Sequence, residues 1–88
     1  MAVYCISYDL KSDNYENLIE AIKAYGTYWH QTESTWFIES SQAAKEIFNN
    51  LSNHLKTDDK LIVIEVKQHW WATGHKQDEY DWMKQRNF

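Results

Sequence analysis

The segment Val3-Tyr4-Cys5-Ile6-Ser7-Tyr8-Asp9-Leu10 decides the fold, because it is rich in β-branched and aromatic residues and begins almost at the first Met. A polar cluster typical of a turn follows at residues 11–14, so residues 3–9 are predicted to form a strand. This strand ends on the carboxylate of Asp9. An acid in this place binds a metal, activates water or caps the turn that follows.

Two later segments carry apolar residues at the three- and four-residue spacing of an amphipathic helix, at residues 15–25 and 44–55. Gly26 is suited to ending the first helix in a left-handed conformation. Short polar residues that precede each helix are the expected caps, Asp13 or Asn14 for the first and Ser40 or Ser41 for the second.

Strand patterns occupy most of the remaining sequence. Residues 27–39 contain two runs of β-forming residues separated by a polar stretch, which predicts two antiparallel strands. Residues 60–67 are almost continuously apolar, a pattern typical of a strand that is covered on both faces or lies centrally in a sheet. The resulting βαββαβ order predicts an α+β, ferredoxin-like fold, with strand order 4-1-3-2 and two helices on one face of the sheet.

The predicted ferredoxin-like domain ends near residue 67, and residues 68–88 form an extension with three of the five Trp residues. The pattern from His75 onward predicts a short C-terminal helix. A tail this aromatic is rarely left in water, so we expect it to dock on the sheet of its own subunit or of a neighbour.

Composition indicates one domain of 88 residues in a reducing cytoplasm, since the single Cys forms no internal disulfide. No apolar run approaches the length of a membrane span, and no signal peptide is expected. The formal charge of −4, from 13 acidic and 9 basic residues, argues against a broad electropositive surface for long nucleic acids.

Asp9 is the leading candidate for chemistry, with Tyr8, Lys11 and Ser12 placed to orient a ligand or substrate. If two subunits meet at this point, two Asp9 carboxylates could share one Mg²⁺, because water fills the remaining positions around that ion. Alternatively, Asp9 accepts hydrogen bonds from turn N–H groups around Lys11 and Ser12. No cofactor is required in the second case.

Aromatic residues form a second candidate site, for interface packing or base stacking: Tyr28, Trp29, Trp36, Trp70 and Trp71. Stacking platforms normally lie in basic surroundings, whereas Glu33, Glu39 and Glu65 flank these rings, so packing is favoured. His69 and His75 match no compact zinc spacing. The two glycines form no phosphate-binding loop.

The combined pattern resembles the small bacterial and phage proteins known as SinR-like, which are related to the CRISPR-associated adaptation endonuclease subunit and to the VapD toxins. Four segments carry this resemblance: Ile6-Ser7-Tyr8-Asp9-Leu10, Ala24-Tyr25-Gly26, Ser34-Thr35-Trp36-Phe37-Ile38 and Leu61-Ile62-Val63-Ile64-Glu65-Val66. It covers residues 1–67, and the Trp-rich tail is similar to the SinR-like branch.

The resemblance implies a homodimer, and it implies that the aspartate ending the first strand, here Asp9, is a metal-linked catalytic residue of a nuclease. The related CRISPR subunit also serves as a scaffold that holds DNA without cutting it. Two hypotheses follow: a non-catalytic binding or assembly module for nucleic acid, a nucleotide or a protein, or a Mg²⁺-dependent endonuclease. The acidic charge and the isolated carboxylate favour the first.

Overall fold

The N-terminal segment forms strand β1 over Ala2–Asp9, which confirms the strand predicted at residues 3–9. The structure is a computed structural model that describes residues 1–11, 15–86 and 88, with the backbone alone at residues 31 and 32. Six further elements follow β1: α1 (Tyr15–Lys23), β2 (Tyr28–Thr32), β3 (Thr35–Ser40), α2 (Ala44–Ser52), β4 (Lys60–Val66) and α3 (Gln77–Lys84).

Local sequence explains the C-terminal end of α1. Gly26 follows α1 with a φ of 87°, the left-handed conformation predicted for it. The predicted caps Asp13 and Asn14 lie outside the described residues. The prediction that Ser40 or Ser41 caps the second helix is wrong, because α2 begins at Ala44 and the Ser40 hydroxyl instead accepts a hydrogen bond from the backbone N–H of Gln42.

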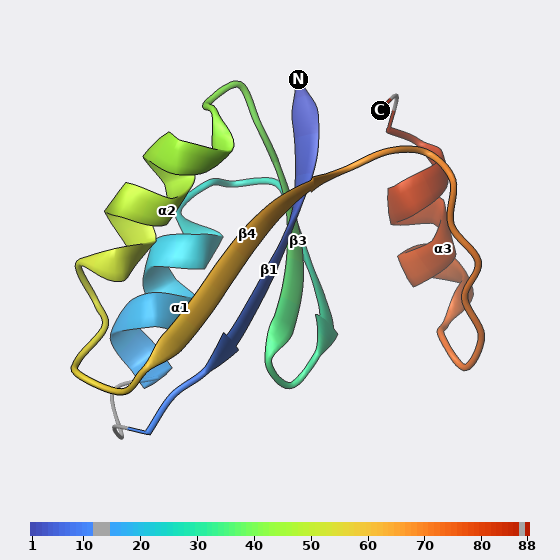
Figure 1. The fold of residues 1–88 in the computed structure, drawn as a ribbon. Helices are drawn as coiled ribbons and strands as arrows, with labels where there is room; N and C mark the ends of the chain where they lie inside the picture. Colours follow the sequence, from blue (N-terminus) through green and yellow to red (C-terminus); the bar gives the residue numbers. More distant parts are fainter. Residues whose placement is uncertain (12–14, 87) are drawn as a thin grey trace.

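The four strands form one antiparallel sheet in the order β2-β3-β1-β4. Counted from the opposite edge, these are the same neighbours as in the order 4-1-3-2. Figure 1 shows α1 and α2 side by side on one face of the sheet and α3 on the other. The class is therefore α+β, with the two helices of the predicted βαββαβ unit on a common face.

Alternation along β1 separates the two faces of the sheet. On the face covered by α1 and α2, here the core face, Tyr4, Ile6 and Tyr8 are buried. They pack in one cluster with residues of both helices and of β3: Leu18, Ile22, Ile47, Leu51, Trp36 and Ile38. The intervening residues of β1, with Cys5 and Ser7 among them, lie on the opposite or outer face.

The prediction that residues 60–67 form a covered or central strand is wrong in one respect. β4 lies at the edge of the sheet, and its neighbour among the described strands is β1. Its outer-face residues Ile62 and Ile64 are 52% and 47% exposed. The core-face residues Leu61 and Val63 pack against the core of the same chain, so only the outer-face half of the apolar run lacks a cover within it.

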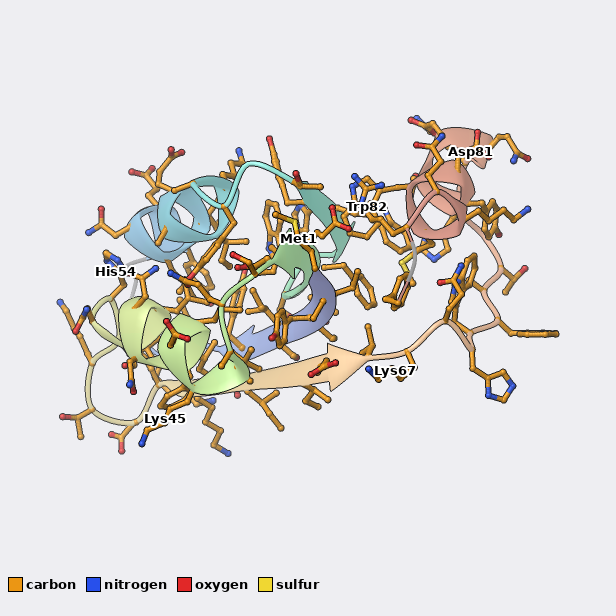
Figure 2. All side chains as sticks on the ribbon, turned by 90° about the horizontal axis from the view of Figure 1, so that it is seen from above. Met1, Lys45, His54, Lys67, Asp81 and Trp82 are labelled. Atoms are coloured by element: carbon orange, nitrogen blue, oxygen red, sulfur yellow. The ribbon has the colours of Figure 1, made fainter. Side chains whose placement is uncertain are left out.

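The C-terminal segment docks on the sheet of its own chain. Trp82 of α3 lies toward the sheet and Asp81 lies away from it (Figure 2). Trp29 on the outer face of β2 is the centre of the contact: its ring lies 6.1 Å from the Trp82 ring, and its indole N–H donates to Glu79 Oε2 at 3.3 Å. The docked segment covers the β2–β3 part of the outer face.

Candidate functional site

The carboxylate of Asp9 lies at the end of β1, where the sequence places it, and its side chain is 60% exposed. The Lys11 ammonium lies 3.4 Å from Asp9 Oδ2. An ion pair this exposed contributes little to stability, so a ligand can separate the two groups at small cost. Lys60 is the cross-strand neighbour of Asp9 in the β1–β4 ladder. Ser12 lies outside the described residues.

A cleft of about 570 Å³ opens beside Asp9. Residues from the end of β1, from α1 and from the β2–β3 hairpin line it: Tyr8, Asp9, Leu10, Tyr15, Ile19, His30, Glu33 and Ser34. Its size lies within the range of small-molecule sites in proteins, which combine apolar walls with a few polar groups. The cleft brings together Tyr8 and Asp9, two of the predicted site residues.

Tyr8 is held rigidly in the wall of this cleft. Its hydroxyl donates to the carbonyl oxygen of Glu33 at 3.3 Å and accepts from the indole N–H of Trp36 at 3.2 Å. Burial raises the pKa of the phenol, although the bond from Trp36 opposes this shift. Tyr8 therefore stays neutral at physiological pH and links the β2–β3 hairpin to β1.

The aromatic ring of His30 is held in place by stacking on a neighbouring ring. Its ring is stacked on that of buried Trp36, with centroids 3.8 Å apart and an interplanar angle of 6°. The other aromatic residue near the mouth is Tyr15, which is 44% exposed and donates its hydroxyl hydrogen to the Leu10 carbonyl oxygen at 3.2 Å. Both rings are thus preorganised, one by stacking and one by a hydrogen bond.

The predicted aromatic set is divided between the two faces of the sheet. Tyr28 and Trp36 lie on the core face, where their rings meet edge to face at 5.7 Å. Trp29 lies on the outer face and is buried beneath α3. Trp70 is half-buried in the tail, and Trp71 is 90% exposed. These residues therefore do not form one flat platform.

The sequence analysis did not identify a role for Asp59, whose carboxylate stabilises the turn after β1. Its Oδ1 accepts the backbone N–H of Lys11 at 2.7 Å, and its Oδ2 accepts that of Lys56 at 2.9 Å. The turn N–H of Lys11 was expected to bind Asp9, but it binds the carboxylate of a loop 48 residues away. The Asp9 carboxylate is correspondingly free to pair with the Lys11 ammonium.

We expect Asp59→Ala to lower the free energy of unfolding by about 2 kcal/mol, because two backbone donors lose a charged acceptor. Asp59→Asn can still accept one of the two bonds and should lose roughly half as much. Urea denaturation of the three proteins checks this order. Equal stabilities of the Ala variant and the parent would show that water replaces the carboxylate without loss.

The remaining cleft residues follow from topology more than from local sequence. β3 runs antiparallel beside β1, so the β2–β3 hairpin lies next to the C-terminal end of β1. That neighbour relation brings His30, Glu33 and Ser34 to Asp9. The signal was available in the predicted strand order, but no local motif marks these three residues.

Metal-ligand clusters and membrane-spanning helices are both absent from the described part of the chain. Within residues 1–11, 15–86 and 88, no group of three or more His, Cys, Asp or Glu side chains is arranged to hold a metal ion. A site shared by two Asp9 carboxylates would need a second chain. In these same ranges, no helix has the length and apolar character needed to cross a membrane.

Comparison with protein-family models, with curated proteins and with solved structures gives no significant match for this chain.

Proposed function

We propose that the protein is a non-catalytic binding module of the ferredoxin-like class, which acts as a homodimer and holds a nucleotide or a short single-stranded nucleic acid at the end of β1. The strand order and the placement of α1 and α2 on one face support the fold class. The cleft beside Asp9 is the observation that carries the binding function.

The lining of the cleft suits a nucleobase better than a phosphate. Asp9 and Glu33 repel an anion, but their oxygens can accept hydrogen bonds from the amino or imino groups of a base. The preorganised ring of His30 offers stacking, as aromatic side chains do for unpaired bases. The interior of the cleft therefore has both hydrogen-bond acceptors and an aromatic contact for a base.

The side chains that can bind a phosphate group lie outside the cleft. Lys11 pairs with Asp9 and Lys60 is its cross-strand neighbour, and both lysines are exposed. A bound nucleotide would place its base in the cleft and its phosphate toward these lysines. This local arrangement needs no basic surface over the whole molecule, and it is compatible with the net charge of −4.

The pairing of Asp9 supports binding over catalysis. Asp9 pairs with the Lys11 ammonium at 3.4 Å, and this adjacent positive charge lowers the attraction of the carboxylate for Mg²⁺. We therefore propose no metal for the binding function.

Titration of the four ribonucleoside monophosphates and of an eight-nucleotide single-stranded RNA, followed by calorimetry, tests this proposal. We expect saturable binding that His30→Ala weakens by about 5- to 100-fold, the range for loss of one stacking partner. Lys60→Ala should reduce the salt dependence of binding, whereas Lys45→Ala, which removes an exposed lysine of α2, should not.

Absence of binding by all of these probes at millimolar concentration, or unchanged affinity in His30→Ala, would overturn the proposal. The same samples are incubated with Mg²⁺ and analysed for cleavage. Cleavage by the parent protein that Asp9→Asn abolishes with the fold intact would establish the endonuclease alternative.

A further inference from the structure

β4 has the continuous apolar sequence typical of a strand that is buried on both faces, but it lies at an edge of the sheet. Its residues from Leu61 to Ile64 are all aliphatic, yet its outer-face side chains Ile62 and Ile64 are about half exposed. α3 lies on this outer side of the sheet (Figure 1), where its Trp82 ring meets Trp29 of β2 and not β4. Proteins that remain monomeric usually interrupt such an edge with Lys or Pro, and here lysines stand at its two ends, Lys60 and Lys67.

The backbone groups of β4 that face outward can be identified from the hydrogen bonding of β1. The N–H of Tyr8 donates to the Ser34 carbonyl oxygen, so Tyr8 faces β3. Adjacent residues of an antiparallel strand direct their backbone groups to opposite sides, and Ser7 therefore faces β4, where it lies opposite Ile62. It follows that the odd-numbered residues Leu61, Val63 and Glu65 direct their N–H and C=O groups to the free edge.

We propose that β4 pairs with β4 of a second copy of this chain, antiparallel, with Val63 on the two-fold axis. Leu61 and Glu65 of each copy then pair with Glu65 and Leu61 of the other, and Val63 pairs with Val63. About six backbone hydrogen bonds form, and the two sheets become one. This interface rests on the homodimer of the proposed function, and it is independent of the ligand in the cleft.

Side chains select this register over its neighbours. With Val63 on the axis, Ile62 of each copy lies opposite Ile64 of the other, so four isoleucines meet on the outer face. Centring on Ile62 instead would place Glu65 opposite Asp59, two like charges. Centring on Ile64 would keep Ile62 opposite Val66, but it would place Lys67 opposite Leu61 instead of opposite Asp59.

Charge at the two ends of β4 favours a second copy as the occupant of this edge. Asp58 and Asp59 precede the strand. Lys67 follows it (Figure 2). In the Val63-centred register, Lys67 of each copy lies opposite Asp59 of the other. Asp59 before the strand and Lys67 after it can thus face each other only when the strand meets itself in the antiparallel direction.

Sedimentation equilibrium tests the interface. The parent protein is expected to be a dimer, and Ile64→Lys is expected to weaken its dimerisation by at least about 100-fold, because each dimer carries the buried charge twice. Tyr28→Lys places the same charge on β2, the opposite edge of the sheet, and should leave the dimer intact. A parent protein that is monomeric at all concentrations, or an equal effect of both variants, would overturn the proposal.

Cysteine pairs test the register. Cys5→Ala is the background, because Cys5 lies opposite Ile64 on β1 and would otherwise form a disulfide with Cys at that position. Ile62→Cys and Ile64→Cys proteins are prepared separately and then mixed under mild oxidation. The mixture is expected to form cross-linked dimers, while each protein alone is not. Stronger cross-linking of either protein alone would place the axis elsewhere and overturn this register.

Nucleotide titration of Ile64→Lys separates this inference from the proposed function. Ile64 does not line the cleft, so a monomeric variant should still bind the mononucleotide that the parent binds. A monomeric parent that binds nucleotides refutes the interface together with the homodimer and leaves the ligand proposal standing. A dimer of the expected register that binds none refutes the ligand proposal alone.

Discussion

Trp36→Ala is expected to lower the free energy of unfolding by about 3–5 kcal/mol, the usual cost of removing a large aromatic side chain from a core. Trp36 is 2% exposed and belongs to the cluster between the sheet and helices α1 and α2. A domain of this size is stable by only about 5–10 kcal/mol. Urea denaturation should therefore show a protein that is partly unfolded without denaturant at 37 °C.

The indole N–H of Trp36 makes a separable contribution. Trp36→Phe keeps most of the apolar contact but removes the donor to the Tyr8 hydroxyl, and we expect a loss of about 1–2 kcal/mol. The Phe variant is also the sharper probe of the cleft, since it folds but supports His30 with a smaller ring. If Trp36→Ala were destabilised by less than the Phe variant, Trp36 would not belong to the core.

The fold was largely predictable because its signals are local and periodic. Each signal corresponds to one backbone geometry: the alternation in β1 to a strand, the apolar spacing in α1 and α2 to a helix, and Gly26 to a left-handed residue after a helix. The position of β4 was harder to interpret from its own composition. An unbroken apolar run predicts that both faces of a strand are buried. It does not predict whether the residues that bury them belong to the same chain or to another.

The cleft was predictable only at its β1 end. Tyr8 and Asp9 are adjacent in sequence, and their position at a strand end is visible from the β-forming run. Asp59 acts on Lys11 from a loop after α2, and His30 is set by stacking on Trp36. The Asp59 contact depends on the packing of distant segments, and the stack of His30 on Trp36 depends on the exact register of the β2–β3 hairpin, neither of which periodicity and composition encode.

Trp29→Ala is expected to release the C-terminal segment while the sheet stays folded. Trp29 contacts the segment with both its ring and its N–H: His75 meets the ring edge to face at 5.2 Å, and Glu79 accepts from the indole. The Glu79 carboxylate is also bonded to His75 Nδ1 at 2.9 Å, and this bond is the main cause of its lowered pKa. The loss of one side chain thus removes the shared partner of both residues.

Hydrogen exchange measures this release residue by residue. Amide protection in α3 should fall by about 100-fold or more in Trp29→Ala, whereas protection in β1 should change little, since local opening and global unfolding are separate events. Trp71→Ala is the matched control, because Trp71 is 90% exposed and its removal should change stability by less than about 0.5 kcal/mol.

If α3 kept its amide protection in Trp29→Ala, contacts of the segment other than those of Trp29 would provide most of the docking energy. Among these is the Arg86–Glu39 pair, in which Arg86 Nε and Glu39 Oε1 lie 3.8 Å apart. This pair is long for a charge-assisted hydrogen bond. Apolar burial around Trp29 therefore contributes more to docking than this pair, and the tail is held to the outer face of its own sheet mainly by its packing against this ring.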